Sequence, residues 1–80
     1  MASLEKLQSA FVSAIGVQPG VDFDTLAYGQ TSGWDSIAHM NLVNEIETSF
    51  DIMLDTEDVI AMSSFPEARK ILGKYGVAFP

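Results

Sequence analysis

Three residues that could cooperate in catalysis lie close together in this 80-residue chain. Asp35 and Ser36 are adjacent, and His39, the only histidine, follows one helical turn after the serine. An acid, a base and a hydroxyl group are the parts of an activated serine nucleophile, in which the histidine bonds both the serine and the acid. The cluster suggests two hypotheses: a serine that attacks a substrate, or a serine that another enzyme modifies.

The spacing disfavours a hydrolase. Asp35 precedes a stretch of helical periodicity, so its carboxylate is expected to turn back and cap the first turn of that helix. No third group is then evident to orient His39. The residues around Ser36 follow the pattern W-x-S-x-A, which differs from the sharp-turn motif G-x-S-x-G of many hydrolases. We expect no enzyme activity from this cluster.

The charge distribution indicates the class of partner. The formal net charge is −7, and the stretch 22–58 holds nine acids with no lysine or arginine. We expect no binding to nucleic acid, because neutralising its phosphates needs a basic face. An acidic field favours partners with basic patches, although it also serves solubility alone. Cysteine is absent, and the acidic clusters at 22–24 and 55–58 lack calcium-loop spacing, so no metal site is predicted.

Length and composition predict one folded domain over residues 1–80. The hydrophobic content of 48% is sufficient for a core. No apolar run is long enough to span a bilayer, and the first residues do not resemble a secretory signal. We therefore expect a soluble cytoplasmic protein without stable membrane insertion, and a monomer is the simplest expectation.

Hydrophobic periodicity and capping residues predict an all-α fold. Long helices are expected over 3–16 and from Asp35 or Ser36 to about Phe50. A short helix is expected over 56–61. The last helix should begin at the capping-box pattern at 64–67 and end at the glycines at 73 and 76. A long loop, 17–34, joins the first two and holds enough apolar residues to pack against the body. The prediction is a small antiparallel bundle of three main helices and one short helix.

The second helix carries two apolar strips. Leu42, Val43, Ile46 and Phe50 share the face expected to enter the core, in line with His39. Ile37 and Met40 lie on another face with Glu47, either as the edge of the core or as an exposed docking strip. Ser36 lies in the first turn, where free N–H groups and the helix dipole favour a phosphate ester. A serine that only caps the helix is the alternative.

The chain resembles the acyl carrier protein family over nearly its full length. The resemblance rests on the Asp35-Ser36-Ile37 motif in "GWDS", on "EIETSFDIML" at the end of the second helix, on the acidic short helix, and on "SSFPEARKIL". It implies that a separate magnesium-dependent phosphopantetheinyl transferase attaches 4′-phosphopantetheine from coenzyme A to Ser36. The thiol of this arm then carries acyl or related groups as thioesters to acyl-loading and acyl-processing enzymes that have basic patches.

The resemblance also implies two sets of residues around the serine. The expected docking residues are Ile37, Met40, Glu47, Asp55, Glu57 and Asp58. The expected lining of a cargo cavity is His39, Leu42, Val43, Ile46 and Phe50. His39 either borders this cavity and biases which chains enter, or is a structural residue bonded to a loop carbonyl.

The residues around the motif depart from carriers of primary fatty acid synthesis. Ala38 and Asn41 occupy positions that are often acidic there, and Trp34 is more typical of specialised fatty acid, polyketide, peptide or lipid-modifying pathways. The alternative from another functional class is an acidic helical protein-interaction module that is not modified and uses Ile37 and Met40 only for docking.

Overall fold

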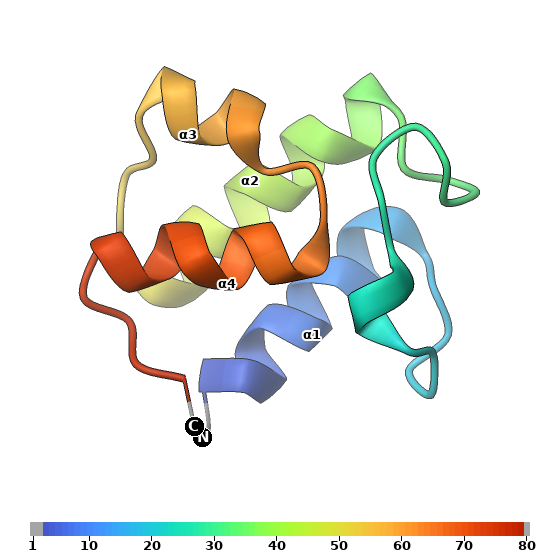
Figure 1. Cartoon of the computed structure of the whole chain (residues 1–80), viewed down its shortest axis with the longest axis horizontal. Coiled ribbons are helices and arrows are strands. Elements are labelled where there is room, and N and C mark those ends of the chain that lie inside the picture. Colours follow the sequence, from blue (N-terminus) through green and yellow to red (C-terminus); the bar gives the residue numbers. More distant parts are fainter. Residues whose placement is uncertain (1–2, 80) are drawn as a thin grey trace.

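The chain folds into a small bundle of helices (Figure 1). The computed structural model describes residues 3–79. These residues form four α-helices and one 3-10 turn and contain no strand beyond a single antiparallel bridge between Ala27 and Ser64. The elements are α1 (Ser3–Ile15), η1 (Phe23–Thr25), α2 (Ser36–Phe50), α3 (Thr56–Ala61) and α4 (Phe65–Lys74). The predicted all-α bundle with three main helices and one short helix is confirmed.

The centre of the bundle lies between α1 and α2, which run side by side in opposite directions (Figure 1). Leu7 and Phe11 of α1 and Leu42 and Ile46 of α2 have no exposed surface. Burial of side chains of this size stabilises the fold by roughly 1.5–3 kcal/mol each relative to an exposed position. The predicted core stripe of α2 is therefore present, with Phe50 only partly buried at its far end.

The loop between α1 and α2 packs against the helices, as its apolar residues predict. Trp34, at its end, is 1% exposed and meets Phe11 edge to face, with ring centroids 5.3 Å apart. Gly33 allows the loop to pass close to the end of α1. Its φ is +89°, and a Cβ there would lie 2.7 Å from the carbonyl oxygen of Ile15. The η1 turn, which the sequence did not predict, begins where the Asp22 side chain accepts the N–H of Asp24.

The start of α4 follows its capping signal. The Ser64 hydroxyl accepts the N–H of Glu67 at 3.2 Å, and Pro66 lies in the first turn, where its missing N–H costs no helical hydrogen bond. The short α3 precedes it and contributes a single buried residue, Asp58. Among residues 3–79, no helix has both the length and the apolar character that crossing a membrane requires.

Candidate functional site

Ser36 is the first residue of α2 and is exposed. The residue before it forms the cap: Oδ1 of Asp35 accepts the N–H of Ala38 at 2.9 Å, and its carbonyl oxygen accepts the N–H of His39 at 2.9 Å. The predicted capping role of Asp35 is confirmed. Its carboxylate is thereby bound to the helix backbone, and the neighbouring serine is left at the surface.

Both ring nitrogens of His39 are engaged. Nδ1 accepts the indole N–H of Trp34 at 3.0 Å, and Nε2 lies 2.7 Å from the carbonyl oxygen of Val59. Because an indole N–H only donates and a carbonyl only accepts, the ring must carry its proton on Nε2. Neither nitrogen is free to take a proton from Ser36. The expected bond to a carbonyl is present, but that carbonyl belongs to α3 and not to a loop.

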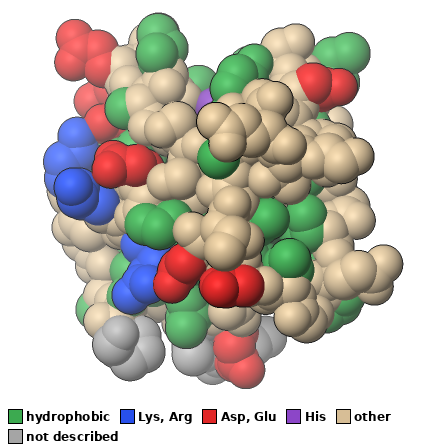
Figure 2. All heavy atoms as spheres, turned by 45° about the vertical axis from the view of Figure 1, so that its right-hand side comes forward, with side chains coloured by type: hydrophobic (Ala, Val, Ile, Leu, Met, Phe, Trp, Pro, Cys, Tyr) green, Lys and Arg blue, Asp and Glu red, His purple; other side chains and the backbone are tan. Residues whose placement is uncertain are grey.

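An apolar pocket of about 230 Å³ opens beside His39. The other residues that line it come from the long loop, from α3 and from the segment after α3: Tyr28, Val59, Ile60, Met62 and Ser63. Figure 2 shows the histidine, in purple, in a notch between two raised parts of the surface, each carrying hydrophobic side chains in green. The pocket therefore lies one helical turn away from Ser36 along α2.

The pocket differs from the cavity expected from the sequence. Of the five residues assigned to that cavity, only His39 lines the pocket. Leu42, Val43 and Ile46 are packed into the core, and Phe50 is partly buried. A larger hollow of about 430 Å³, between α1 and the loop that follows it, is lined by none of the predicted site residues.

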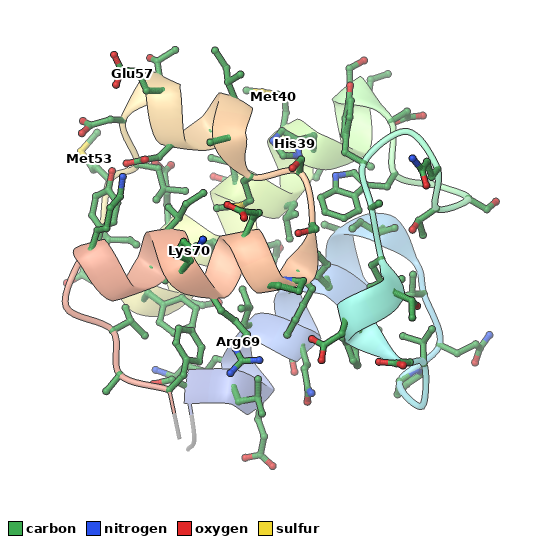
Figure 3. The ribbon with its side chains drawn as sticks, viewed as in Figure 1. His39, Met40, Met53, Glu57, Arg69 and Lys70 are labelled. Atoms are coloured by element: carbon green, nitrogen blue, oxygen red, sulfur yellow. The ribbon has the colours of Figure 1, made fainter. Side chains whose placement is uncertain are left out.

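The second apolar strip of α2 is exposed and does not form the edge of the core. Ile37 is 73% exposed and Met40 is 63% exposed, and Ile60 of α3 adds a further side chain that is 76% exposed. Figure 3 places Met40, Met53 and Glu57 on the side of the molecule formed by α2 and α3, whereas Arg69 lies beyond α4. Sequence reasoning missed Ile60 because a short helix has too few turns to reveal which face is exposed.

The acidic residues assigned to docking occupy different environments. Asp55 and Glu57 are exposed at the start of α3. Glu47 is partly buried, and its Oε2 accepts the N–H of Leu54 at 2.8 Å, which fixes the turn after α2. Asp55 stands at the N-cap position of α3, but its side chain makes no capping hydrogen bond.

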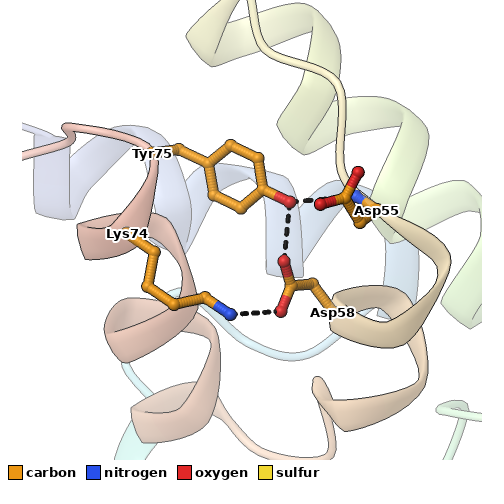
Figure 4. A network of polar contacts seen from close by, with 4 residues as sticks. All are labelled: Asp55, Asp58, Lys74 and Tyr75. Atoms are coloured by element: carbon orange, nitrogen blue, oxygen red, sulfur yellow. Dashed lines mark hydrogen bonds and ion pairs between the residues drawn. The ribbon is translucent and has the colours of Figure 1, made fainter.

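Asp58 is only 8% exposed and connects α3 to the end of α4 (Figure 4). The Lys74 ammonium and the Tyr75 hydroxyl each donate to its carboxylate at 2.6 Å, and the Tyr75 oxygen accepts the N–H of Asp55 at 2.9 Å. The hydrogen bonds from Lys74 and then Tyr75 lower the pKa of Asp58, and the hydrogen bond to Asp58 raises the pKa of Lys74. The inward position of Asp58 removes it from the expected docking surface.

Comparison of the chain with protein-family models, curated proteins and solved structures finds no match. The assignment of a function therefore rests on the residues and their arrangement: an exposed serine at a helix start, an apolar pocket one turn along that helix, and exposed apolar side chains on α2 and on the acidic α3.

Proposed function

We propose that this chain is a carrier protein that receives 4′-phosphopantetheine on Ser36 and presents acyl groups to partner enzymes without catalysing a reaction itself. One observation supports this most strongly. Ser36 is exposed at the first position of α2, and the same helix carries His39 at the wall of an apolar pocket one turn later. A hydroxyl group open to a second enzyme and an apolar space nearby are what a tethered acyl group requires.

The residues around Ser36 fit a phosphate ester. A phosphate on Oγ would lie at the positive end of the α2 dipole, which favours negative charge. Asp35 already accepts the Ala38 N–H, so the N–H groups left at this end belong to Ser36 and Ile37. When bound, the phosphopantetheine arm would supply a thiol that holds an acyl group as a thioester.

The surface beside Ser36 supports transient contacts with enzymes. Ile37 and Met40 provide exposed apolar area, and Asp55 and Glu57 provide negative charge at the adjacent α3. Charges at the rim of an interface speed encounter more than they raise affinity. We propose that a partner with basic residues around an apolar depression docks here and releases the carrier after each step.

The experiment that tests the proposal is a measurement of intact mass. The purified protein is incubated with coenzyme A, Mg²⁺ and a phosphopantetheinyl transferase of broad specificity. The expected result is a gain of one phosphopantetheine in the wild type and no gain in Ser36→Ala. Ser32→Ala, which removes an exposed hydroxyl from the preceding loop, is the matched control and should be modified like the wild type.

The exposed strip of Ile37, Met40 and Ile60 also favours an interaction module that is never modified. The mass measurement separates the two functions, because a module without attachment gains no mass with any transferase. A lack of mass gain with several transferases of different specificity would leave the interaction module as the better assignment.

A further inference from the structure

The short α3 contributes little apolar surface to the core and makes polar contacts with two neighbouring helices, while Met62, directly after it, is fully buried. Asp58 is its only buried residue, and Ile60 points one of the largest apolar side chains of the helix toward solvent. Asp58, in the middle of α3, is bonded through its side chain to Lys74 of α4. The next residue, Val59, is bonded through its carbonyl oxygen to His39 of α2. Two consecutive residues therefore attach α3 to two different helices.

The attachment at His39 uses a carbonyl that the helix itself leaves free. A helix of six residues cannot satisfy its last carbonyl groups internally. The N–H of Ser63, which would reach Val59 in a longer helix, bonds the carbonyl of Ala61 instead. His39 supplies the missing donor to Val59 at 2.7 Å.

The other side of the His39 ring is fixed to the core. Trp34 donates to Nδ1, and Trp34 is itself 1% exposed and packed against Phe11. The Tyr28 ring meets the imidazole edge to face, with centroids 5.3 Å apart. The imidazole thus spans from a buried aromatic cluster to the backbone of α3, and Tyr28 and Ile60 line the same pocket as His39.

The volume of the pocket limits what it can hold. An apolar cavity of about 150 Å³ accommodates benzene, so a pocket of about 230 Å³ has room for roughly six to nine carbon atoms. The end of a longer chain stays in solvent unless α3 moves away from α2, and that movement must break the bond between His39 and Val59. Unless a water molecule replaces the histidine, the Val59 carbonyl would then lack a hydrogen-bond donor, and an unpaired carbonyl raises the free energy of the widened pocket.

We propose that His39 is a specificity-determining residue of this pocket: by fixing the Val59 carbonyl to the buried Trp34, it limits the accepted cargo to apolar acyl groups of short to medium length. This inference rests on the proposed function, because it assumes that Ser36 carries the acyl group. His39 acts here as a positioning residue, since it sets the distance between α2 and α3.

The test uses the full chain loaded with acetyl, butanoyl, hexanoyl, octanoyl, dodecanoyl or hexadecanoyl phosphopantetheine from the corresponding acyl-coenzyme A. Intact mass first establishes that loading is complete. The melting temperature Tm is then compared with that of the protein carrying phosphopantetheine alone. In the wild type, Tm should rise from acetyl to octanoyl and rise no further with the two longest chains. In His39→Ala, the rise should continue to dodecanoyl.

Three further variants separate specificity from a general loss of stability. His39→Gln introduces an amide oxygen that can accept the Trp34 N–H and an N–H₂ group that can donate to Val59, so it should keep the wild-type dependence on chain length at least in part. Ile60→Phe narrows the pocket from an exposed position and should move the plateau to shorter chains, even if His39→Ala does not fold. Val12→Ala, in α1, should lower every Tm equally and leave the chain-length dependence unchanged.

The outcomes distinguish the inference from the proposed function. Two results would overturn the role of His39. One is that Tm depends on chain length in the same way in His39→Ala and in the wild type, and the other is that Tm of the wild type continues to rise up to hexadecanoyl. If Ser36 gains no mass, the proposed function fails, and octanoyl N-acetylcysteamine thioester is titrated against the unmodified protein instead. A saturable change in Trp34 fluorescence emission, with an affinity at least tenfold weaker in Ile60→Phe, would still support the pocket. No change in the emission of the wild type would overturn the pocket.

Discussion

The indole N–H of Trp34 donates to Nδ1 of His39 over 3.0 Å, and the two rings are stacked with centroids 6.0 Å apart. This pair joins the end of the long loop to the first turns of α2, next to Ser36. An indole N–H buried without an acceptor costs about 1–3 kcal/mol, so each ring fixes the position of the other. The loop that leads to the serine is therefore held by a side-chain contact as well as by packing.

Replacement of Trp34 by phenylalanine tests the strength of this contact. Trp34→Phe removes the donor to His39 and leaves space beside Phe11, so the free energy of unfolding should fall by about 2–3 kcal/mol. Urea unfolding followed by far-UV circular dichroism measures this change. Tyr28→Phe keeps the ring at a position that is 43% exposed and should change stability by less than about 0.5 kcal/mol. Equal losses in both variants would contradict the importance of the indole bond.

The helices and their starts could be predicted from the sequence because the signals are local. Asp35 and Ser64 are capping residues that act on N–H groups three positions later, and both caps are present. The apolar positions of α2 repeat with the period of the helix, so Leu42 and Ile46 could be assigned to the core before the fold was known. Serine at the first position of α2 follows from the same local pattern.

The contacts that shape the candidate site could not be predicted in this way. His39 meets Val59 across 20 positions of sequence, and Asp58 meets Lys74 across 16. An acid in the first turn of a short helix is ordinarily exposed, and no local pattern indicates that a lysine in another helix turns it inward. The pocket walls at Tyr28 and Ile60 likewise depend on how the loop and α3 fold over α2.

Gly33 should be one of the least replaceable residues in the chain. Its φ of +89° is unfavourable for any residue with a Cβ, and that Cβ would meet the Ile15 carbonyl oxygen at 2.7 Å. Gly33→Ala should therefore lower the free energy of unfolding by at least about 2 kcal/mol. Gly20→Ala is the matched control, because a Cβ at Gly20 meets nothing within 4 Å. Thermal unfolding of the two variants should differ clearly; similar Tm values would contradict the close approach at Gly33.

Two substitutions of Asp35 separate its capping role from its charge. Asp35→Ala removes the acceptor of the Ala38 N–H and should cost about 1 kcal/mol of stability. Asp35→Asn keeps a side-chain oxygen at the cap and should remain within about 0.5 kcal/mol of the wild type. Chemical denaturation measures both. Under the proposed function, the rate of mass gain at Ser36 is then compared for the two variants; a rate that is normal in Asp35→Asn shows that the cap matters more than the charge.

The contact between Asp58 and Lys74 predicts a dependence of stability on pH. The hydrogen bonds from Lys74 and Tyr75 lower the pKa of Asp58 from its ordinary value of 3.8, so the folded state holds the ionised carboxylate more favourably than the unfolded state does. This contribution is complete above about pH 4 and is lost as the pH falls through the lowered pKa. The pKa values of Lys74 and Tyr75 are raised from 10.5 and 10.0, so their contribution is complete below these values and is lost as the pH rises above them.

Asp58→Asn should lower Tm by several degrees between pH 5 and 9. The difference from the wild type should begin to shrink below about pH 4 and should vanish below the lowered pKa of Asp58, where the folded wild type also loses the ionised carboxylate. Scanning calorimetry at a series of pH values measures this difference directly. Glu57→Gln is the matched control because it makes the same change of charge at the adjacent, exposed position of α3. It should leave Tm and its pH dependence near those of the wild type. A parallel loss in both variants would mean that net charge, and not the attachment of α3 to α4, governs the effect.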